Sequence, residues 1–210
     1  MAEKIRISVL MGIYNCAATL DEALESLYAQ TYQGFKVLLC DDGSTDNTYE
    51  VARRHAEHHP NVFVVRNPKN MGLNYTLNHC LEYADTEYCA RMKYFDESGI
   101  FRVGRGKGEI TKEDFITGSP ICQAPCRVRT KAYKSVKGYT VDKKLLRVED
   151  YHLWFKMYAK GYKAYMLKDP IYSMRDDRNA VARRNMKGAV NEFYVRYIGF
   201  KMLTLPLYSY

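Results

Sequence analysis

The first 92 residues alternate short apolar runs with amphipathic stripes, and this alternation restricts the chain to one class of fold. The runs IRISVLM, KVLLC and VFVV are nearly continuous and rich in β-branched residues, as is typical of strands covered on both faces. Between the runs, leucine and alanine recur at helical spacing. Such alternation predicts an α/β fold, a mostly parallel, Rossmann-like sheet flanked by helices. We expect strands at 5–11, 36–40, 62–65 and 87–92, and helices starting near residues 19, 48 and 73.

Two side-chain patterns refine the expected helices. Thr19 followed by Glu22 has the spacing of a capping box, so the first helix is expected to begin at Thr19. The second helix carries three histidines, which we place on its solvated face: His55, His58 and His59.

The pattern changes after Met92, and the elements expected there are shorter. No repeat or low-complexity linker is visible, so we predict one domain over 1–180. Residues 181–210 are predicted to be a basic, amphipathic helical appendage, which either docks on the sheet or lies on an anionic membrane surface. Within the domain we expect a hairpin over 95–105, a helix just after Glu149-Asp150 and a strand over 163–167.

Charge and cysteine content restrict the partners and the cellular compartment expected for this chain. Thirty-two Lys and Arg against 24 Asp and Glu give a net charge of +8, which favours anionic partners. No nucleic-acid-binding module is recognised, so nucleic acid is not an expected partner. The chain starts without a signal peptide and has no long apolar run, so we expect a cytoplasmic protein, with peripheral attachment to the inner face of the membrane as the alternative. Its six cysteines are then expected to be reduced and mostly buried.

The strongest chemical signal is a pair of carboxylates directly after a buried strand. Asp41 and Asp42 follow the run KVLLC, and in parallel sheets ligands bind beyond the carboxyl ends of the strands. A turn at Gly43 and a helix cap at Ser44 would explain those two residues but not the doubled acid. We interpret one carboxylate as an acceptor for a nucleobase N–H or a ribose hydroxyl.

Three segments resemble the family 2 glycosyltransferases of the GT-A fold. The first is SVLMGIYNCAATLDEALESLYAQTYQGFKVLLCDDGSTDNT, which is similar to the family's nucleotide-binding half. The second is Asn70-Met71-Gly72-Leu73 with Asn78, and the third is Gly138-Tyr139 with the run VEDYHLW at 148–154. The resemblance covers about three quarters of the chain in collinear order.

The resemblance implies transfer of a sugar, with inversion, from a nucleotide diphosphate donor to an acceptor hydroxyl of a glycan or lipid-linked acceptor, in surface polysaccharide or glycolipid assembly. Asp150 would be the general base, with Glu149, His152 and Trp154 as candidates near the acceptor. Without the resemblance, Glu149-Asp150 fits equally well as an acidic pair that complements a helix dipole. The residues that would bind the nucleotide sugar are Gly12, Tyr14, Asp41, Asp42, Asn70, Gly72 and Arg91.

One departure from the family pattern puts activity in doubt. Family members place an Asp-x-Asp-type motif after the fourth strand, and its carboxylates hold Mn²⁺ or Mg²⁺ against the donor diphosphate. Here Arg91 and Met92 are followed by Lys93, so we expect no metal ligands and interpret the chain as shortened between Met92 and Lys93. Asp96 and Glu97 are the alternative ligands. The alternative functions are a catalytically impaired nucleotide-binding remnant, or a basic membrane or nucleic-acid adaptor on an α/β scaffold.

Overall fold

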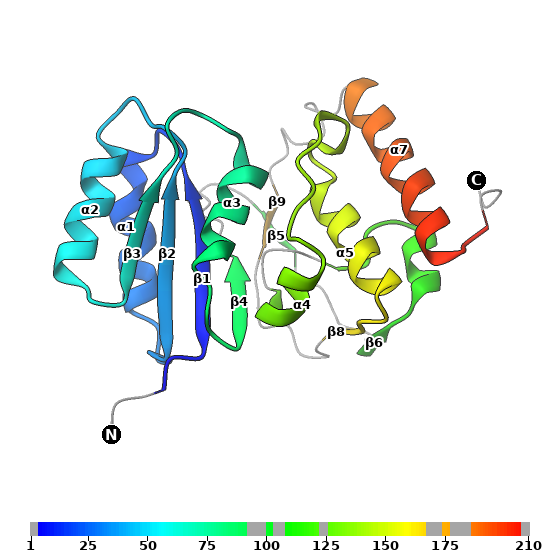
Figure 1. Ribbon diagram of the computed structural model, residues 1–210, viewed down its shortest axis with the longest axis horizontal. Helices are drawn as coiled ribbons and strands as arrows, with labels where there is room; N and C mark the ends of the chain where they lie inside the picture. The colour runs from blue at the N-terminus through cyan, green and yellow to red at the C-terminus, as the bar shows by residue number, and fades with distance from the viewer. Residues whose placement is uncertain are drawn as a thin grey trace. The chain divides into compact units, whose positions relative to one another are not determined.

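The computed structural model describes residues 4–91, 100–102, 108–121, 126–166, 174–176 and 186–206 (Figure 1). The chain divides into two compact units. The first unit comprises Met1–Tyr94 and Cys126–Gly138, and the second comprises Phe95–Pro125 and Tyr139–Tyr210. The predicted boundary at 180/181 stays a prediction.

The first unit is built on a five-stranded, mostly parallel sheet with the order β3-β2-β1-β4-β7. Four strands run parallel to one another, and β7 pairs antiparallel with β4 at one edge. The fold class predicted from the apolar runs is therefore confirmed. The strands are β1 (Ile7–Ile13), β2 (Phe35–Asp41), β3 (Val62–Arg66), β4 (Tyr88–Arg91) and β7 (Arg127–Arg129).

Helices cover both faces of this sheet because alternate strand residues point to opposite sides. Val37 and Leu39 of β2 pack in one core with α1 (Ala17–Tyr28) and α2 (Thr48–His58). On the other face lies α3 (Leu73–Glu82), whose Cys80 thiol donates to the Leu38 carbonyl (Figure 1). A short helix, α4 (Thr130–Ser135), follows β7.

The predicted capping box at Thr19 is wrong. Helix α1 begins at Ala17, and the Thr19 hydroxyl donates to the Cys16 carbonyl inside the first turn. The amides at the start of the helix are satisfied instead by side chains of Thr48, the first residue of α2, and of Asp46 in the loop before it. The Cys16 N–H donates to Thr48 Oγ1 over 2.7 Å, and the Ala17 N–H donates to a carboxylate oxygen of Asp46. With these partners in place, the helix needs no cap from its own sequence.

The histidines of α2 do not share one environment. His58 is exposed, as expected, but His55 is buried between α1 and α2. The His55 ring bonds the Asp21 carboxylate through Nε2 at 2.8 Å and the Tyr28 hydroxyl through Nδ1 at 3.2 Å. The solvated-face prediction is therefore wrong for His55, because polar partners on α1 make its burial tolerable.

The second unit is built around two packed helices, α5 (Glu149–Ala159) and α7 (Met186–Leu203). Gly199 permits their close contact, because a Cβ there would lie 2.2 Å from the Phe155 ring. Phe155 also packs edge-on against Phe200 and beside Phe115. The other elements are strands β5 (Ile100–Arg102), β6 (Gly108–Ile110), β8 (Ala164–Met166) and β9 (Met174–Asp176), with the 3₁₀ turns η1 (Lys112–Ile116) and η2 (Lys143–Leu145).

The strands of this unit pair over long sequence distances. Strand β5 pairs antiparallel with β9, and β6 pairs antiparallel with β8. The turn of the predicted hairpin, at Ser98-Gly99, lies outside the described residues. The helix predicted after Glu149-Asp150 and the strand predicted over 163–167 are confirmed as α5 and β8.

Five cysteines lie in the described part of the chain, and all are free thiols. Cys40, Cys80 and Cys89 are buried, whereas Cys16 and Cys126 are partly exposed. Over the same residues, no helix is both long and apolar enough to cross a bilayer.

Candidate functional site

Asp41 and Asp42 form an acidic corner at the carboxyl edge of the sheet. Backbone hydrogen bonds that continue the sheet past this edge hold the corner in place. The Asp42 N–H donates to the Ile13 carbonyl and the Asn67 N–H to the Asp41 carbonyl, both over 2.8 Å. Gly43 then turns the chain at a φ of +70°. A Cβ at Gly43 would lie 2.5 Å from the Lys69 backbone, so only glycine lets the loop after β3 approach this closely.

Asp41 is completely buried, and a cation of the protein neutralises its carboxylate. Arg66 Nε lies 2.9 Å from Asp41 Oδ2, and the Ser44 N–H donates to the same carboxylate. The Arg66 guanidinium also donates to the Ser44 carbonyl and stacks over the Tyr49 ring. This ion pair neutralises Asp41 and fixes the turn that follows it.

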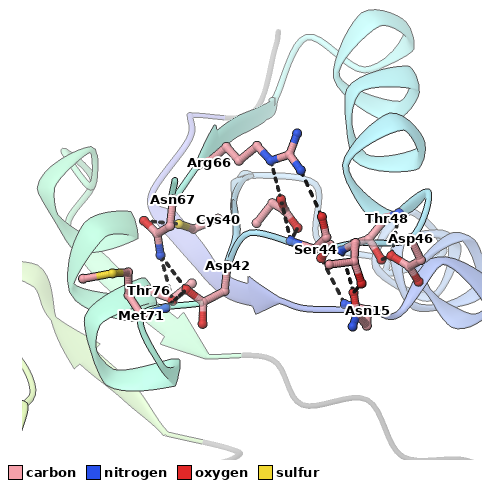
Figure 2. Close-up of polar contacts among 12 residues, drawn as sticks. Asn15, Cys40, Asp42, Ser44, Asp46, Thr48, Arg66, Asn67, Met71 and Thr76 are labelled. Atoms are coloured by element: carbon pink, nitrogen blue, oxygen red, sulfur yellow. Dashed lines mark hydrogen bonds and ion pairs between the residues drawn. The ribbon is translucent and has the colours of Figure 1, made fainter. Parts of the chain in front are cut away.

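Asp42 is buried too, but its partners are neutral. Oδ1 accepts from Asn67 Nδ2 and from the Met71 N–H, both over 2.8 Å (Figure 2). Oδ2 accepts from the Gly72 N–H over 2.9 Å. Among the described residues no cation pairs with this carboxylate. An ionised carboxylate offers about four lone-pair positions, so Oδ2 keeps acceptor capacity for a ligand N–H or O–H.

Asn67 holds Asp42 in this orientation, and the sequence analysis missed it. Besides bonding Asp42, its Nδ2 donates to Thr76 Oγ1 (Figure 2). Its Oδ1 lies 2.8 Å from His79 Nδ1. A signal was available, because Asn67 directly follows β3 and the carboxyl ends of parallel strands meet at one edge.

A second set of bonds joins the loop after β1 to the loop after β2. Asn15, with a φ of +46°, donates its N–H to Ser44 Oγ and accepts from the Thr45 N–H through its side chain (Figure 2). Asp46 Oδ1 accepts from the Thr48 hydroxyl, and this hydrogen bond lowers the pKa of Asp46. The loop after β1 and the loop after β2 are therefore joined by hydrogen bonds beside Asp42.

The first unit brings most predicted nucleotide-binding residues to this edge. Gly12 lies in β1, where a Cβ would be 3.0 Å from Leu73 Cδ1, so its small size lets α3 approach β1. Tyr14, just past β1, is exposed. Asn70 is exposed and its Oδ1 accepts from the Gly72 N–H. Arg91 is the last residue of β4, opposite Leu10 of β1, and its side chain lies outside the described part.

The predicted acceptor-side residues belong to the second unit. Glu149 and Asp150 occupy the first turn of α5 and are half-buried, which also suits the helix dipole. His152 and Trp154 are buried, one turn further on. Neither His152 Nδ1 nor Trp154 Nε1 has a hydrogen-bond partner among the described residues.

Burial lowers the pKa of two titrating groups of α5. It lowers the pKa of His152 to about 4, with a smaller contribution from the positive charge of Lys156. It also lowers the pKa of Lys156 to about 8. Both shifts have the same sign because a low-polarity environment disfavours the charged form.

The described residues do not fit a divalent cation. No group of three or more His, Cys, Asp or Glu side chains in the described ranges lies close enough to hold a metal ion. Strand β4 ends at Arg91, and cationic or thioether side chains such as those of Arg91, Met92 and Lys93 are not ligands for Mn²⁺ or Mg²⁺. Asp96 and Glu97 lie outside the described residues.

The chain is an α/β protein with an acidic corner at the carboxyl edge of its parallel sheet, where proteins of this class bind their ligands. Residues 8–92 match the family model described as glycosyl transferase family 2. EpsE of Bacillus subtilis (strain 168), a glycosyltransferase by name, is 31% identical over 98% of this chain and 85% of its own length. The chain belongs to glycosyl transferase family 2.

Two further proteins extend the comparison. The E. coli protein WfaP, named a UDP-Glc:α-D-GlcNAc-diphosphoundecaprenol β-1,3-glucosyltransferase, is 26% identical over 75% of this chain and 72% of its own. S. aureus TarS (residues 1–349), solved with UDP-GlcNAc, superposes with a TM-score of 0.69 at 19% identity over 97% of this chain and 68% of its own. This likeness shows the fold, and it confirms the GT-A architecture.

The alignment with EpsE is longer than this chain. It runs over 238 positions yet contains 98% of a 210-residue sequence, so roughly thirty positions of EpsE face no residue here. The alignment with WfaP, 188 positions for 75% of the chain, has a similar excess.

Proposed function

We propose that this chain moves a sugar, with inversion, from a nucleotide diphosphate donor to an acceptor hydroxyl in surface polysaccharide or glycolipid assembly. The observation that carries the proposal is the Asp42 carboxylate, which is fixed by three neutral donors at the carboxyl edge of the sheet. Family membership supplies the reaction class.

We assign binding of the nucleotide-sugar donor to the acidic corner. The carboxylate of Asp42 would accept a base N–H or a ribose hydroxyl through the free capacity of Oδ2. Asp41, paired with Arg66, would position this corner and leave ligand contact to Asp42. The names of WfaP and TarS, which include UDP-Glc and a UDP-GlcNAc complex, support a nucleotide-sugar donor.

The acceptor side is assigned to α5. An acceptor hydroxyl must lose its proton as it attacks the anomeric carbon, and a fixed carboxylate takes that proton. Asp150 would be this base, with Glu149, His152 and Trp154 near the acceptor. The name of WfaP, whose acceptor is a diphosphoundecaprenol-linked sugar, supports a lipid-linked or glycan acceptor.

A second candidate function is a catalytically impaired, nucleotide-binding remnant. It is favoured by Arg91 at the end of β4 and Lys93 just after it, and by the roughly thirty positions of EpsE that face no residue here. These observations support a chain shortened between Met92 and Lys93, where the family's metal ligands would stand.

Calorimetric titration with UDP, GDP and dTDP, each with and without Mn²⁺, separates the candidates. Binding that needs Mn²⁺ supports the transferase, and binding indifferent to Mn²⁺ supports the remnant. The absence of any nucleotide binding would reject both and leave a basic adaptor.

Two variants test the assigned roles. Asp42→Asn is expected to weaken nucleotide binding about tenfold or more, because a charge-assisted hydrogen bond is lost. Asp150→Asn is expected to bind nucleotide normally while release of UDP from UDP-glucose falls by about a hundredfold or more. Equal loss of affinity in both variants would contradict this division of roles.

A further inference from the structure

Helix α7 packs one of its faces against the rest of the second unit. Phe200 lies edge-on to Phe155 at 6.1 Å between ring centroids, and Val195 and Leu203 are buried with it. Arg196 donates to the Ile116 carbonyl. These contacts determine which side of the helix points away from the unit.

The opposite face of α7 carries an exposed apolar stripe. Its members recur at intervals of four, three and four residues, which places them on one side of a helix. Isolated exposed apolar residues are normal, but a continuous row marks an interaction surface. The outer stripe consists of Met186, Val190, Phe193 and Tyr197, which are 86%, 63%, 71% and 41% exposed.

Basic residues border the outer stripe on α7 and on the neighbouring turn. The turn η2 packs against α7, where Asn191 donates to the Leu146 carbonyl over 3.1 Å. Lys144 of this turn lies over the Tyr194 ring, and exposed Leu146 adds to the apolar surface. Lys201 bonds the Tyr197 hydroxyl at the far end of the stripe. The basic border consists of the exposed Lys143, Lys144, Arg147, Lys187 and Lys201.

Acidic residues nearby cancel little of the positive charge of this basic border. Glu192 of α7 is paired with Arg196 at 2.8 Å. Asp142 uses a carboxylate oxygen to accept the Lys144 N–H at the start of η2. The surface therefore combines an apolar centre with a cationic edge.

We propose that the outer stripe and its basic border bind the surface of an anionic bilayer. The apolar side chains enter the boundary between headgroups and acyl chains, and the basic residues contact lipid phosphates. Charge complementarity selects this partner over a second copy of the chain. A two-fold self-interface would bring the same five cations near their own copies, which is unfavourable. The proposal does not depend on the donor site.

Vesicle flotation tests the charge requirement. The full chain is expected to bind vesicles of phosphatidylglycerol mixed with phosphatidylcholine, to bind phosphatidylcholine alone far less, and to dissociate as salt is raised. Lys143→Glu/Lys144→Glu is expected to weaken binding by about tenfold or more, because each basic residue near an anionic surface contributes about fivefold. The matched control Lys131→Glu/Lys134→Glu, with the same charge change on exposed positions of α4, is expected to stay within about twofold of the parent chain.

A second pair of variants tests the apolar contribution. Phe193→Ser is expected to weaken vesicle binding, whereas Phe63→Ser, at an exposed phenylalanine of β3, is not. Equal binding to both vesicle types, or equal loss in a variant and its control, would overturn the proposal. So would a dimer in analytical ultracentrifugation that Phe193→Ser dissociates while vesicle binding is unchanged. Circular dichroism checks that each variant stays folded.

Discussion

At the scale of single residues, the two adjacent aspartates have different environments although they are identical in sequence. Asp41 faces a cation and is fully buried, whereas Asp42 faces amide donors only. A carboxylate whose charge is not cancelled by the protein is the better acceptor for a ligand. We therefore propose a positioning role for Asp41 and a ligand-binding role for Asp42.

Asn67→Ala tests how far Asp42 depends on its neighbour. The variant removes a donor from the buried Asp42 carboxylate and breaks the bonds to Thr76 and His79. The free energy of unfolding is expected to fall by about 1–3 kcal/mol, and nucleotide affinity should fall with it. Denaturant titration and calorimetry measure the two effects.

The matched control is Asn61→Ala, at the opposite end of β3. Asn61 donates one bond, to the Phe35 carbonyl, so its loss is expected to cost at most about 1 kcal/mol and to leave nucleotide affinity unchanged. If Asn67→Ala behaves like Asn61→Ala, the positioning role is refuted.

The sequence predicted the place of the acidic corner but not its partners. Asp41 and Asp42 were identified because two acids after a buried strand demand an explanation. Asn67 and Arg66 were not identified as site residues, because single polar residues at or after the end of a strand are common. Their importance comes from the parallel register, which places Arg66 opposite Asp41.

At the scale of elements, α5 joins a hydrophobic core to the residues assigned to the acceptor. The first turn holds Glu149 and Asp150, while residues 151–155 and Met157 are buried. His152 therefore lies in a low-polarity environment, and its protonation opposes folding.

This burial predicts acid sensitivity. Because the pKa of His152 is about 4 when folded and 6.5 when unfolded, the unfolded chain binds a proton in that range that the folded chain does not. Stability from this group is complete above pH 6.5 and is lost as the pH falls toward 4. At pH 5 the loss is expected to be about 2 kcal/mol relative to neutral pH.

Denaturant titration at pH 7.5 and pH 5, followed by fluorescence of the single tryptophan, Trp154, measures this loss. His152→Gln is expected to reduce the difference between the two pH values by that amount. His58→Gln, at an exposed histidine, should leave it unchanged. An unaltered pH dependence in His152→Gln would show that another group is responsible.

Strands and helices of the first unit were predictable because long apolar runs and helical stripes specify them locally. Strands β5 and β9 were not predicted as a pair, because each has three residues and its partner lies far away in the sequence. The predicted start of α1 was wrong because Thr48 of α2 and Asp46, both distant in sequence, satisfy the amides at the start of the helix.

At the scale of the whole molecule, family membership covers nearly all of the chain, yet its alignment with EpsE leaves roughly thirty positions unmatched. The five-stranded sheet and the acidic corner formed by Asp41 and Asp42 both lie within the first compact unit. Under the proposed donor assignment, the first unit is expected to bind nucleotide even where turnover is lost.

A crystal structure with the nucleoside diphosphate that binds tightest in the titrations tests this account most directly. We predict a base N–H or ribose hydroxyl within about 3 Å of Asp42 Oδ2, with the bonds from Asn67, Met71 and Gly72 preserved. A nucleoside bound at any other surface, with Asp42 still holding only its three protein donors, would contradict the central claim.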